Sequence, residues 1–265
     1  MAKQPRAKGA NRANPRADRN IGAPSARGGR YQQQDRTSNV IELNFPQKPK
    51  KQRVDIVPRN LTQENLLASL EDSSKYVTFA VGPAGTGKTL LATLHAIKCF
   101  KAGLVEKIVI TRPNVAVDDK DIGYLPGDIL KKMTPWMMPV LDVFAEYYTQ
   151  IEIQTMLEEN IIEMVPIAFI RGRTFKNAYI LVDEAQGTTP NSLLSILTRI
   201  GEGSQMVVTG DLAQSDRGAD NGLADFLNRF QGSKHIDVIK FARQDVERHP
   251  VVKELLGIYG DNKGI

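Results

Sequence analysis

The sequence predicts an α/β fold built on one parallel sheet, with helices in the connections between strands. Short runs rich in Val, Ile and Leu recur along the chain. They are almost entirely apolar, which is typical of strands buried on both faces. Stretches of helix-forming residues separate several of them, as the crossovers between parallel strands require. The predicted strands are residues 76–81, 107–111, 178–182, 205–209 and 235–241, with 161–166 as a weaker candidate.

The strand at 76–81 leads directly into the sequence GPAGTGKT, and helix formers follow from Leu90. This octapeptide matches the phosphate-loop pattern G-x-x-x-x-G-K-[ST] at every fixed position. Glycines let backbone N–H groups turn inward around phosphates, and the helix N-terminus adds the positive end of its dipole. An unliganded Gly-rich turn is the weaker alternative. The residues expected to bind the nucleotide are Gly82, Pro83, Ala84, Gly85, Thr86, Gly87, Lys88 and Thr89.

Within this loop, Lys88 is expected to reach the β- and γ-phosphates, and the Thr89 hydroxyl to bind Mg²⁺. A second carboxylate motif follows the strand at 178–182, where the chain continues as Asp183-Glu184. Asp183 is the expected Mg²⁺ partner, and Glu184 the base that activates the attacking water. A turn cap is the alternative role for this pair. The ligands that the sequence predicts are therefore ATP and Mg²⁺.

The separate catalytic glutamate predicts an additional strand between the phosphate-loop strand and the carboxylate strand. The expected sheet order is 235–241, 76–81, 205–209, 178–182 and 107–111. In this order Thr209, Asp211 and Gln214 arrive beside the γ-phosphate, and Gln214 is the expected sensor of that phosphate. An ordinary strand-to-helix turn would explain the same residues.

A helix is expected to start near Arg59, with Asn60 or Thr62 as its cap. Gln63 precedes the phosphate loop at the place where many nucleic-acid translocases hold adenine with a Gln. A surface position on the helix is the alternative. Later helices are expected over 190–197, 222–230 and 250–259.

Three arginines are candidate nucleic-acid contacts. Arg112 follows the strand at 107–111, where Pro113 ends the strand. Arg171 and Arg173 follow the weaker strand candidate at 161–166. All three are expected near the carboxyl edge of the sheet, where ligands gather in open parallel sheets.

Residues 1–54 contain 13 Lys or Arg against 3 Asp or Glu, a net charge of +10. Their low content of large apolar residues predicts a disordered basic tail, followed by one folded domain over residues 55–265. This tail is expected either to contact nucleic-acid phosphates or to act only as a solvated segment.

The single cysteine, Cys99, excludes an internal disulfide and a Cys-based zinc site. No apolar run approaches the length of a membrane span, and the N-terminus lacks the apolar core of a secretory signal. We therefore expect a cytoplasmic protein without membrane contacts.

Over roughly residues 60–260 the chain resembles the PhoH-like ATPase family. The resemblance rests on the motifs GPAGTGKT (82–89), TRPNV (111–115), LPGD (125–128), AFIRGRT (168–174), DEAQ (183–186), LTRIGEGSQMVVTGDLAQ (197–214) and DVERHP (245–250). It implies a single RecA-like P-loop NTPase domain, similar to the motor core of superfamily 1 helicases.

The resemblance further implies ATP hydrolysis by a homo-oligomeric ring, with a hexamer as the expected form. It implies a role on single-stranded RNA, as a helicase or translocase. The motif DVERHP makes Arg248 the expected arginine finger, delivered across a subunit interface. An ion pair of Arg248 with Asp245 or Glu247 is the alternative. The alternative function is a nucleotide-dependent assembly or switch protein, whose ATPase activity controls protein partners.

Overall fold

The computed structural model describes residues 53–113 and 129–254 except 219, 249 and 253, with only the backbone for residues 129–133. The predicted basic tail, apart from its last two residues, lies outside the described residues, as does the motif at 125–128. The predicted last helix is described only at its start, where residues 250–252 are helical.

The six strands that the structure describes are all parallel and form one sheet. Their order confirms the predicted arrangement, including the additional strand between the phosphate-loop strand and the carboxylate strand. The weaker candidate at 161–166 adds a sixth strand at one edge. Across the sheet the order is β3 (Ile162–Met164), β2 (Lys107–Thr111), β4 (Ala178–Val182), β5 (Gln205–Gly210), β1 (Val77–Val81) and β6 (Ile236–Lys240).

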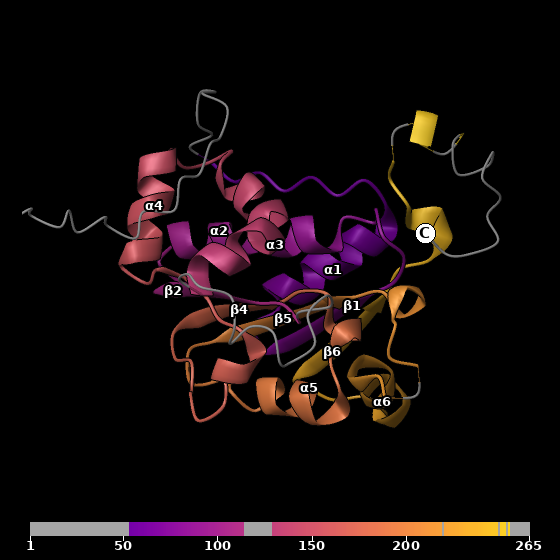
Figure 1. The fold of residues 1–265 in the computed structure, drawn as a ribbon. Helices are drawn as coiled ribbons and strands as arrows, with labels where there is room; N and C mark the ends of the chain where they lie inside the picture. Colours follow the sequence, from indigo (N-terminus) through magenta and orange to yellow (C-terminus); the bar gives the residue numbers. More distant parts are fainter. Residues whose placement is uncertain (1–52, 114–128, 219, 249, 253, 255–265) are drawn as a thin grey trace, which may run out of the picture. The chain divides into compact units, whose positions relative to one another are not determined.

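Helices cover both faces of the sheet (Figure 1). On one face lie α1 (Leu61–Glu71), α2 (Lys88–Lys101), α3 (Ile129–Phe144) and α4 (Gln150–Glu158). On the other face lie α5 (Pro190–Leu197) and α6 (Gly222–Arg229). No helix in the described ranges is long and apolar enough to cross a bilayer.

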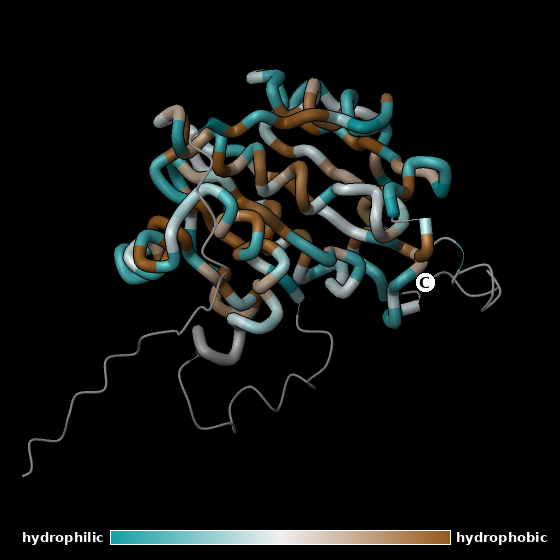
Figure 2. The backbone as a smooth tube through the Cα atoms, turned by 90° about the horizontal axis from the view of Figure 1, so that it is seen from above, coloured by the Kyte–Doolittle hydropathy of each residue, from teal (hydrophilic) through white to brown (hydrophobic). Residues whose placement is uncertain are grey.

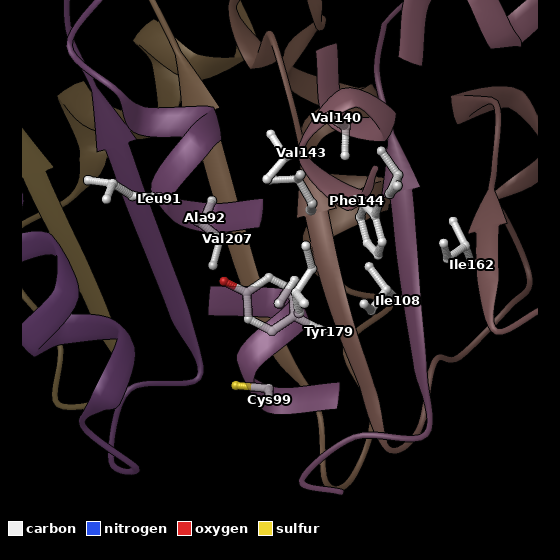
Figure 3. Close-up of a cluster of buried hydrophobic side chains, with 14 of the residues drawn as sticks. Leu91, Ala92, Cys99, Ile108, Val140, Val143, Phe144, Ile162, Tyr179 and Val207 are labelled. Atoms are coloured by element: carbon white, nitrogen blue, oxygen red, sulfur yellow. The ribbon is translucent and has the colours of Figure 1, made fainter. Parts of the chain in front are cut away.

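Each strand contributes side chains to both layers because successive residues point to opposite faces. In β1, Ala80 packs into the cluster under α1–α4, and Phe79 packs into the cluster on the opposite face. Figure 2 shows hydrophobic residues gathered in the middle of the domain and hydrophilic residues along many outer loops. Figure 3 shows the larger cluster, in which Phe144 and Tyr179 are fully buried. Complete burial of an aromatic or aliphatic side chain contributes about 2 kcal/mol.

The helix α3 contains two prolines, Pro135 and Pro139. Proline has no N–H for the helical ladder, and its ring crowds the preceding turn, so it usually ends a helix. Here Met137, Leu141 and Phe144 are fully buried against the sheet, and this packing holds the helix together. The apolar stretch around Trp136 therefore packs within the domain.

Candidate functional site

The carboxyl ends of four neighbouring strands meet at one edge of the sheet. β1 ends at the phosphate loop, β5 at Asp211, β4 at Asp183 and β2 at Arg112. A pocket of about 260 Å³ lies at this edge. Its lining residues are Ala84, Gly85, Gly87, Lys88, Thr89, Leu90, Asp183, Glu184, Thr209, Gly210, Asp211 and Gln214. Residues from motifs far apart in the chain therefore face one cavity.

The phosphate loop depends on glycine at two positions. Gly85 and Gly87 have φ angles of 81° and 83°, in the left-handed region that other residues avoid. Gly87 is also the N-cap of α2, and no side chain among the described residues caps this helix start. The first N–H groups of α2 are therefore available to an anion, and the helix dipole favours negative charge there.

The Lys88 ammonium lies inside the loop and lines the pocket. Its Nζ donates to the carbonyl oxygens of Gly82 and Pro83, both at 2.6 Å, and to the Thr86 hydroxyl at 3.2 Å. Burial lowers the pKa of Lys88, whereas the carboxylates of Asp211, Glu184 and Asp183 act in the opposite direction. A bound phosphate would add further negative charge beside this ammonium and would favour its charged form.

The Asp183 carboxylate accepts two hydroxyl hydrogen bonds and is only 4 % exposed. The Thr89 hydroxyl donates to Oδ1 at 2.7 Å, and the Thr209 hydroxyl donates to the same oxygen at 2.6 Å. Donation of the Thr89 proton to the carboxylate leaves the lone pairs of that hydroxyl for a cation. Hydroxyl and carboxylate oxygens suit Mg²⁺, which otherwise keeps water and phosphate ligands. The residues present therefore fit Mg²⁺.

Glu184 follows Asp183 with a φ angle of 55°, an unusual backbone conformation for a residue with a side chain. Its Oε1 accepts from Nη2 of Arg112 at 3.3 Å. Its Oε2 accepts from the side-chain amide of Gln186. The Oε1 of Gln186 in turn accepts from the backbone N–H of Asp211 at 3.0 Å. Gln186 is the last residue of the DEAQ motif, and its role was not predictable because it depends on the turn after β4.

Asp211 braces the phosphate loop, a role that the sequence analysis did not assign. Its Oδ2 accepts from the backbone N–H of Ala84 at 3.1 Å and from the amide of Gln214 at 2.9 Å. Its Oδ1 accepts from the N–H of Ala213 at 3.0 Å. Gln214 therefore lies in the pocket as expected, and Asp211 fixes it against the loop.

A second pocket, of about 640 Å³, lies against the same loop. The two pockets share Gly85, Gly87 and Leu90. The other lining residues of the second pocket are Asp55, Val57, Arg59, Gln63, Leu91, Leu94, Glu146, Tyr147 and Glu247. This arrangement offers one compartment for phosphates and an adjoining one for a nucleoside.

Gln63 is 4 % exposed, so the alternative prediction of a surface position on the helix is wrong. The carboxamide Nε2 donates to the Thr86 carbonyl at 3.0 Å, and Oε1 accepts from the Arg59 N–H at 2.8 Å. As expected, Asn60 caps α1, accepting from the Gln63 N–H at 3.0 Å. Gln63 thus joins the start of α1 to the phosphate loop.

The segment after β6 covers the phosphate loop of its own chain. The backbone N–H of Glu247 donates to the Gly85 carbonyl at 2.9 Å. A Cβ placed on Gly85 would lie 2.5 Å from Nε of Arg248. Of the predicted ion-pair partners, Asp245 instead accepts from the backbone N–H of Ala242 at 2.8 Å. Arg248 therefore packs directly on the loop.

Arg171 and Arg173, two of the three predicted nucleic-acid contacts, do not line the phosphate pocket. Arg173 pairs with Glu163 of β3 at 2.5 Å and lies over the ring of Phe175, 4.7 Å from its centroid. Arg171 is exposed. Only Arg112 of the three predicted nucleic-acid contacts reaches the carboxylates at the sheet edge.

Comparison with known proteins gives one consistent result. A family model described as "PhoH-like protein" matches residues 55–260. A PhoH-like protein of Bacillus subtilis (strain 168) is 37% identical over 203 residues, 76% of this chain and 63% of that protein. Protein PhoH of Escherichia coli (strain K12) is 38% identical over 208 residues, 77% of this chain and 58% of that protein.

Among solved structures, a match to a Pif1 helicase from Candida albicans covers 78% of this chain and 45% of the helicase chain, with a TM-score of 0.36 and 14% sequence identity. The matched region spans less than two thirds of either curated relative. The family model takes in nearly all of the described domain, including the phosphate loop and the carboxylate motif. The chain therefore belongs to the PhoH-like protein family, and its described part is a P-loop NTPase domain.

Proposed function

We propose that this domain binds ATP with Mg²⁺ and hydrolyses it. The observation that carries the proposal is the meeting of Lys88, Asp183 and Glu184 at one pocket beside the start of α2. Each residue type matches a need of phosphoryl transfer: a cation for the phosphates, a carboxylate for the metal and a base for water.

The loop N–H groups and Lys88 bind the triphosphate in this proposal, and Thr89 and Asp183 hold Mg²⁺. When bound, Mg²⁺ neutralises charge on the phosphate oxygens. Glu184 takes a proton from water as the water oxygen attacks the γ-phosphorus. The bond between this phosphorus and the bridging oxygen breaks, and ADP leaves with the electron pair. Gln214, held by Asp211, is the proposed sensor of the γ-phosphate.

The nucleoside is proposed to occupy the second pocket, beside the phosphate loop. Both ends of the Gln63 amide are already bonded to backbone groups, but each end keeps one further hydrogen-bonding position. Gln63 is therefore proposed to contact adenine while it holds the loop in place.

Three variants test hydrolysis. Lys88→Ala should lose hydrolysis and weaken ATP binding, because it removes the ammonium from the phosphate loop. Lys98→Ala is the matched control, since Lys98 lies on the same helix but pairs at 2.6 Å with Glu71, away from the pocket. Glu184→Gln should bind ATP and stop before cleavage. Normal turnover by Lys88→Ala or Glu184→Gln would refute the proposal.

We further propose that the ATPase is an RNA helicase or translocase, which acts on single-stranded RNA as a ring. Three observations support this proposal: the resemblance of the sequence motifs to the PhoH-like ATPase family, the positive net charge of residues 1–54, and the partly exposed Arg112 at the edge of the site. ATPase rates measured with and without single-stranded RNA test this link. Stimulation by RNA supports it, and indifference to RNA favours the switch protein instead. Sedimentation measures whether the ring forms.

Arg248 is proposed to meet the charge that develops on the γ-phosphoryl group. Its packing on Gly85 of its own chain favours delivery within one subunit over delivery across the ring. Arg248→Ala should bind ATP and lose hydrolysis. Mixing it with Lys88→Ala distinguishes the two routes, because partial recovery requires that a neighbour supply the arginine. We expect no recovery at any mixing ratio, and recovery would establish the route across subunits.

A further inference from the structure

We propose that Arg112 is a positioning residue that holds the general base Glu184 in an inactive orientation until an anion displaces Arg112. The proposal rests on the proposed ATP hydrolysis and adds a means of control to the same site. A single-stranded nucleic acid is the anion that we infer, acting through a backbone phosphate.

The ion pair between the two side chains is direct. Arg112 Nη2 lies 3.3 Å from Glu184 Oε1, and Arg112 Nη1 lies 3.7 Å from Asp183 Oδ2. The guanidinium therefore contacts both the proposed base and the proposed metal ligand. It does so from the neighbouring strand, because β2 lies beside β4 in the sheet.

The second oxygen of Glu184 is also occupied, by the side-chain amide of Gln186. A carboxylate whose two oxygens both accept from protein donors is held in one orientation. Each oxygen keeps a further lone pair, so the two donors fix the direction of these lone pairs, and loss of one donor would let the carboxylate turn towards water in the pocket. Gln186 is 4 % exposed and accepts from the N–H of Asp211 at 3.0 Å, whereas the Arg112 side chain is 24 % exposed, so Arg112 is the donor that a ligand from solvent can reach.

Arg112 is anchored on its other side by the helix α3. Its Nη1 donates to the Trp136 carbonyl at 2.9 Å. This carbonyl belongs to the stretch of α3 between Pro135 and Pro139. Arg112 thus joins Glu184 to α3, which packs against the sheet. Movement of Arg112 would therefore change its contacts with both Glu184 and α3.

The arginine is open to an incoming ligand. Its side chain is 24% exposed, and that of Glu184 is 30% exposed. A guanidinium has five N–H donors, and the hydrogen bonds to Trp136 and Glu184 engage two of them. A phosphate accepts two parallel N–H bonds from such a fork and competes directly with a single carboxylate oxygen. Binding of a backbone phosphate to Arg112 would therefore release Glu184.

The test compares full-length wild type with Arg112→Ala in steady-state ATPase assays with and without poly(U) RNA. Arg112→Ala should raise the RNA-free kcat about three- to fivefold, as expected for loss of one partly exposed ion pair, with little change in KM for ATP. Poly(U) should stimulate wild type and leave the variant unchanged. Arg112→Lys retains the charge but lacks the fork, so its RNA-free kcat should lie between the two.

Two further variants guard the interpretation. Arg112→Ala combined with Glu184→Gln should be inactive, because the gain in rate depends on Glu184. Arg229→Ala is the matched control: it breaks the exposed ion pair with Asp225 on α6 and should change neither rate.

A lower or unchanged RNA-free kcat in folded Arg112→Ala would overturn the proposal, as would an active double variant. If poly(U) stimulated Arg112→Ala as strongly as wild type, the proposal that nucleic acid frees Glu184 from Arg112 would be overturned. A raised kcat in Arg112→Ala without any stimulation of wild type would instead refute the RNA link of the proposed function and leave the restraint by Arg112 standing. The proposed ATP hydrolysis itself is tested separately, by the loss of activity in Lys88→Ala.

Discussion

Arg248 reaches the phosphate loop because Gly85 has no side chain. Gly85→Ala would add a methyl group at φ +81° and force Arg248 to move. Gly103→Ala adds the same group at φ +69°, with no described atom within 4 Å of the new Cβ. Both variants should lose about 1 kcal/mol of unfolding free energy, since both strain the backbone. Only Gly85→Ala should also lose ATPase activity.

Urea denaturation measures the first effect and steady-state turnover the second. A double variant of Gly85→Ala and Arg248→Ala should be no less active than Arg248→Ala alone, because both changes disturb the same arginine. If the effects on turnover multiply, the methyl group acts on the nucleotide itself and Arg248 is not the affected group.

Single residues of the site were predictable where a motif carries its own chemistry. The structure brings Lys88, Thr89, Asp183 and Glu184 together at the sheet edge as the motifs indicated. The partners of Arg112 were not predictable, because one of them is a backbone carbonyl of α3. The placement of Arg173 also depends on the path of the long connection before β4, which local sequence patterns do not encode.

At the scale of elements, the sheet order was predictable from one inference. A predicted catalytic glutamate separate from the predicted metal-binding aspartate implies an inserted strand, and β5 occupies that place. The length of α3 was not predictable, because its prolines oppose a helix and only tertiary packing overrides them. The three-residue strand β3 was uncertain in sequence, since so short a run gives little periodicity.

The start of α1 should affect nucleotide binding as well as stability. Asn60 caps α1, and its Nδ2 also donates to the Asp245 carbonyl at 3.3 Å, in the segment that covers the phosphate loop. Asn60→Ala should therefore lower the unfolding free energy by about 1 kcal/mol and raise KM for ATP. Thr149→Ala removes a comparable cap from α4 and should lower stability alone. Equal KM values for the two variants would contradict the role of α1 in holding the loop.

At the scale of the whole molecule, the charge is divided unevenly along the chain. Residues 1–54 carry a net +10 in a protein whose net charge is +5. Deletion of these residues should leave RNA-free ATPase activity unchanged, because every proposed catalytic residue lies beyond them. It should weaken binding to single-stranded RNA and flatten the dependence of affinity on salt, since fewer counterions are released. Unchanged RNA affinity across a salt titration would show that these residues do not contact RNA.

Acid stability of the whole domain should depend on one buried histidine. His95 is 4% exposed in α2, and its Nδ1 lies 3.3 Å from the Tyr179 hydroxyl and 3.7 Å from the sulfur of Cys99. Burial lowers the pKa of His95 to about 4 from its ordinary value of 6.5, against a smaller opposing effect of Glu71. The unfolded chain therefore binds a proton that the folded domain excludes between these two pH values.

Because the unfolded state binds more protons in this window, the unfolding free energy should fall as pH drops from 6.5 towards 4, by up to about 3 kcal/mol from His95 alone. Urea denaturation at pH 7.5 and 4.5 measures the loss. His95→Gln cannot take up the proton and should lose about 2 kcal/mol less than wild type over this interval. His235→Gln, at an exposed histidine, should lose as much as wild type. An equal loss in His95→Gln and wild type would show that His95 remains protonated in the folded domain.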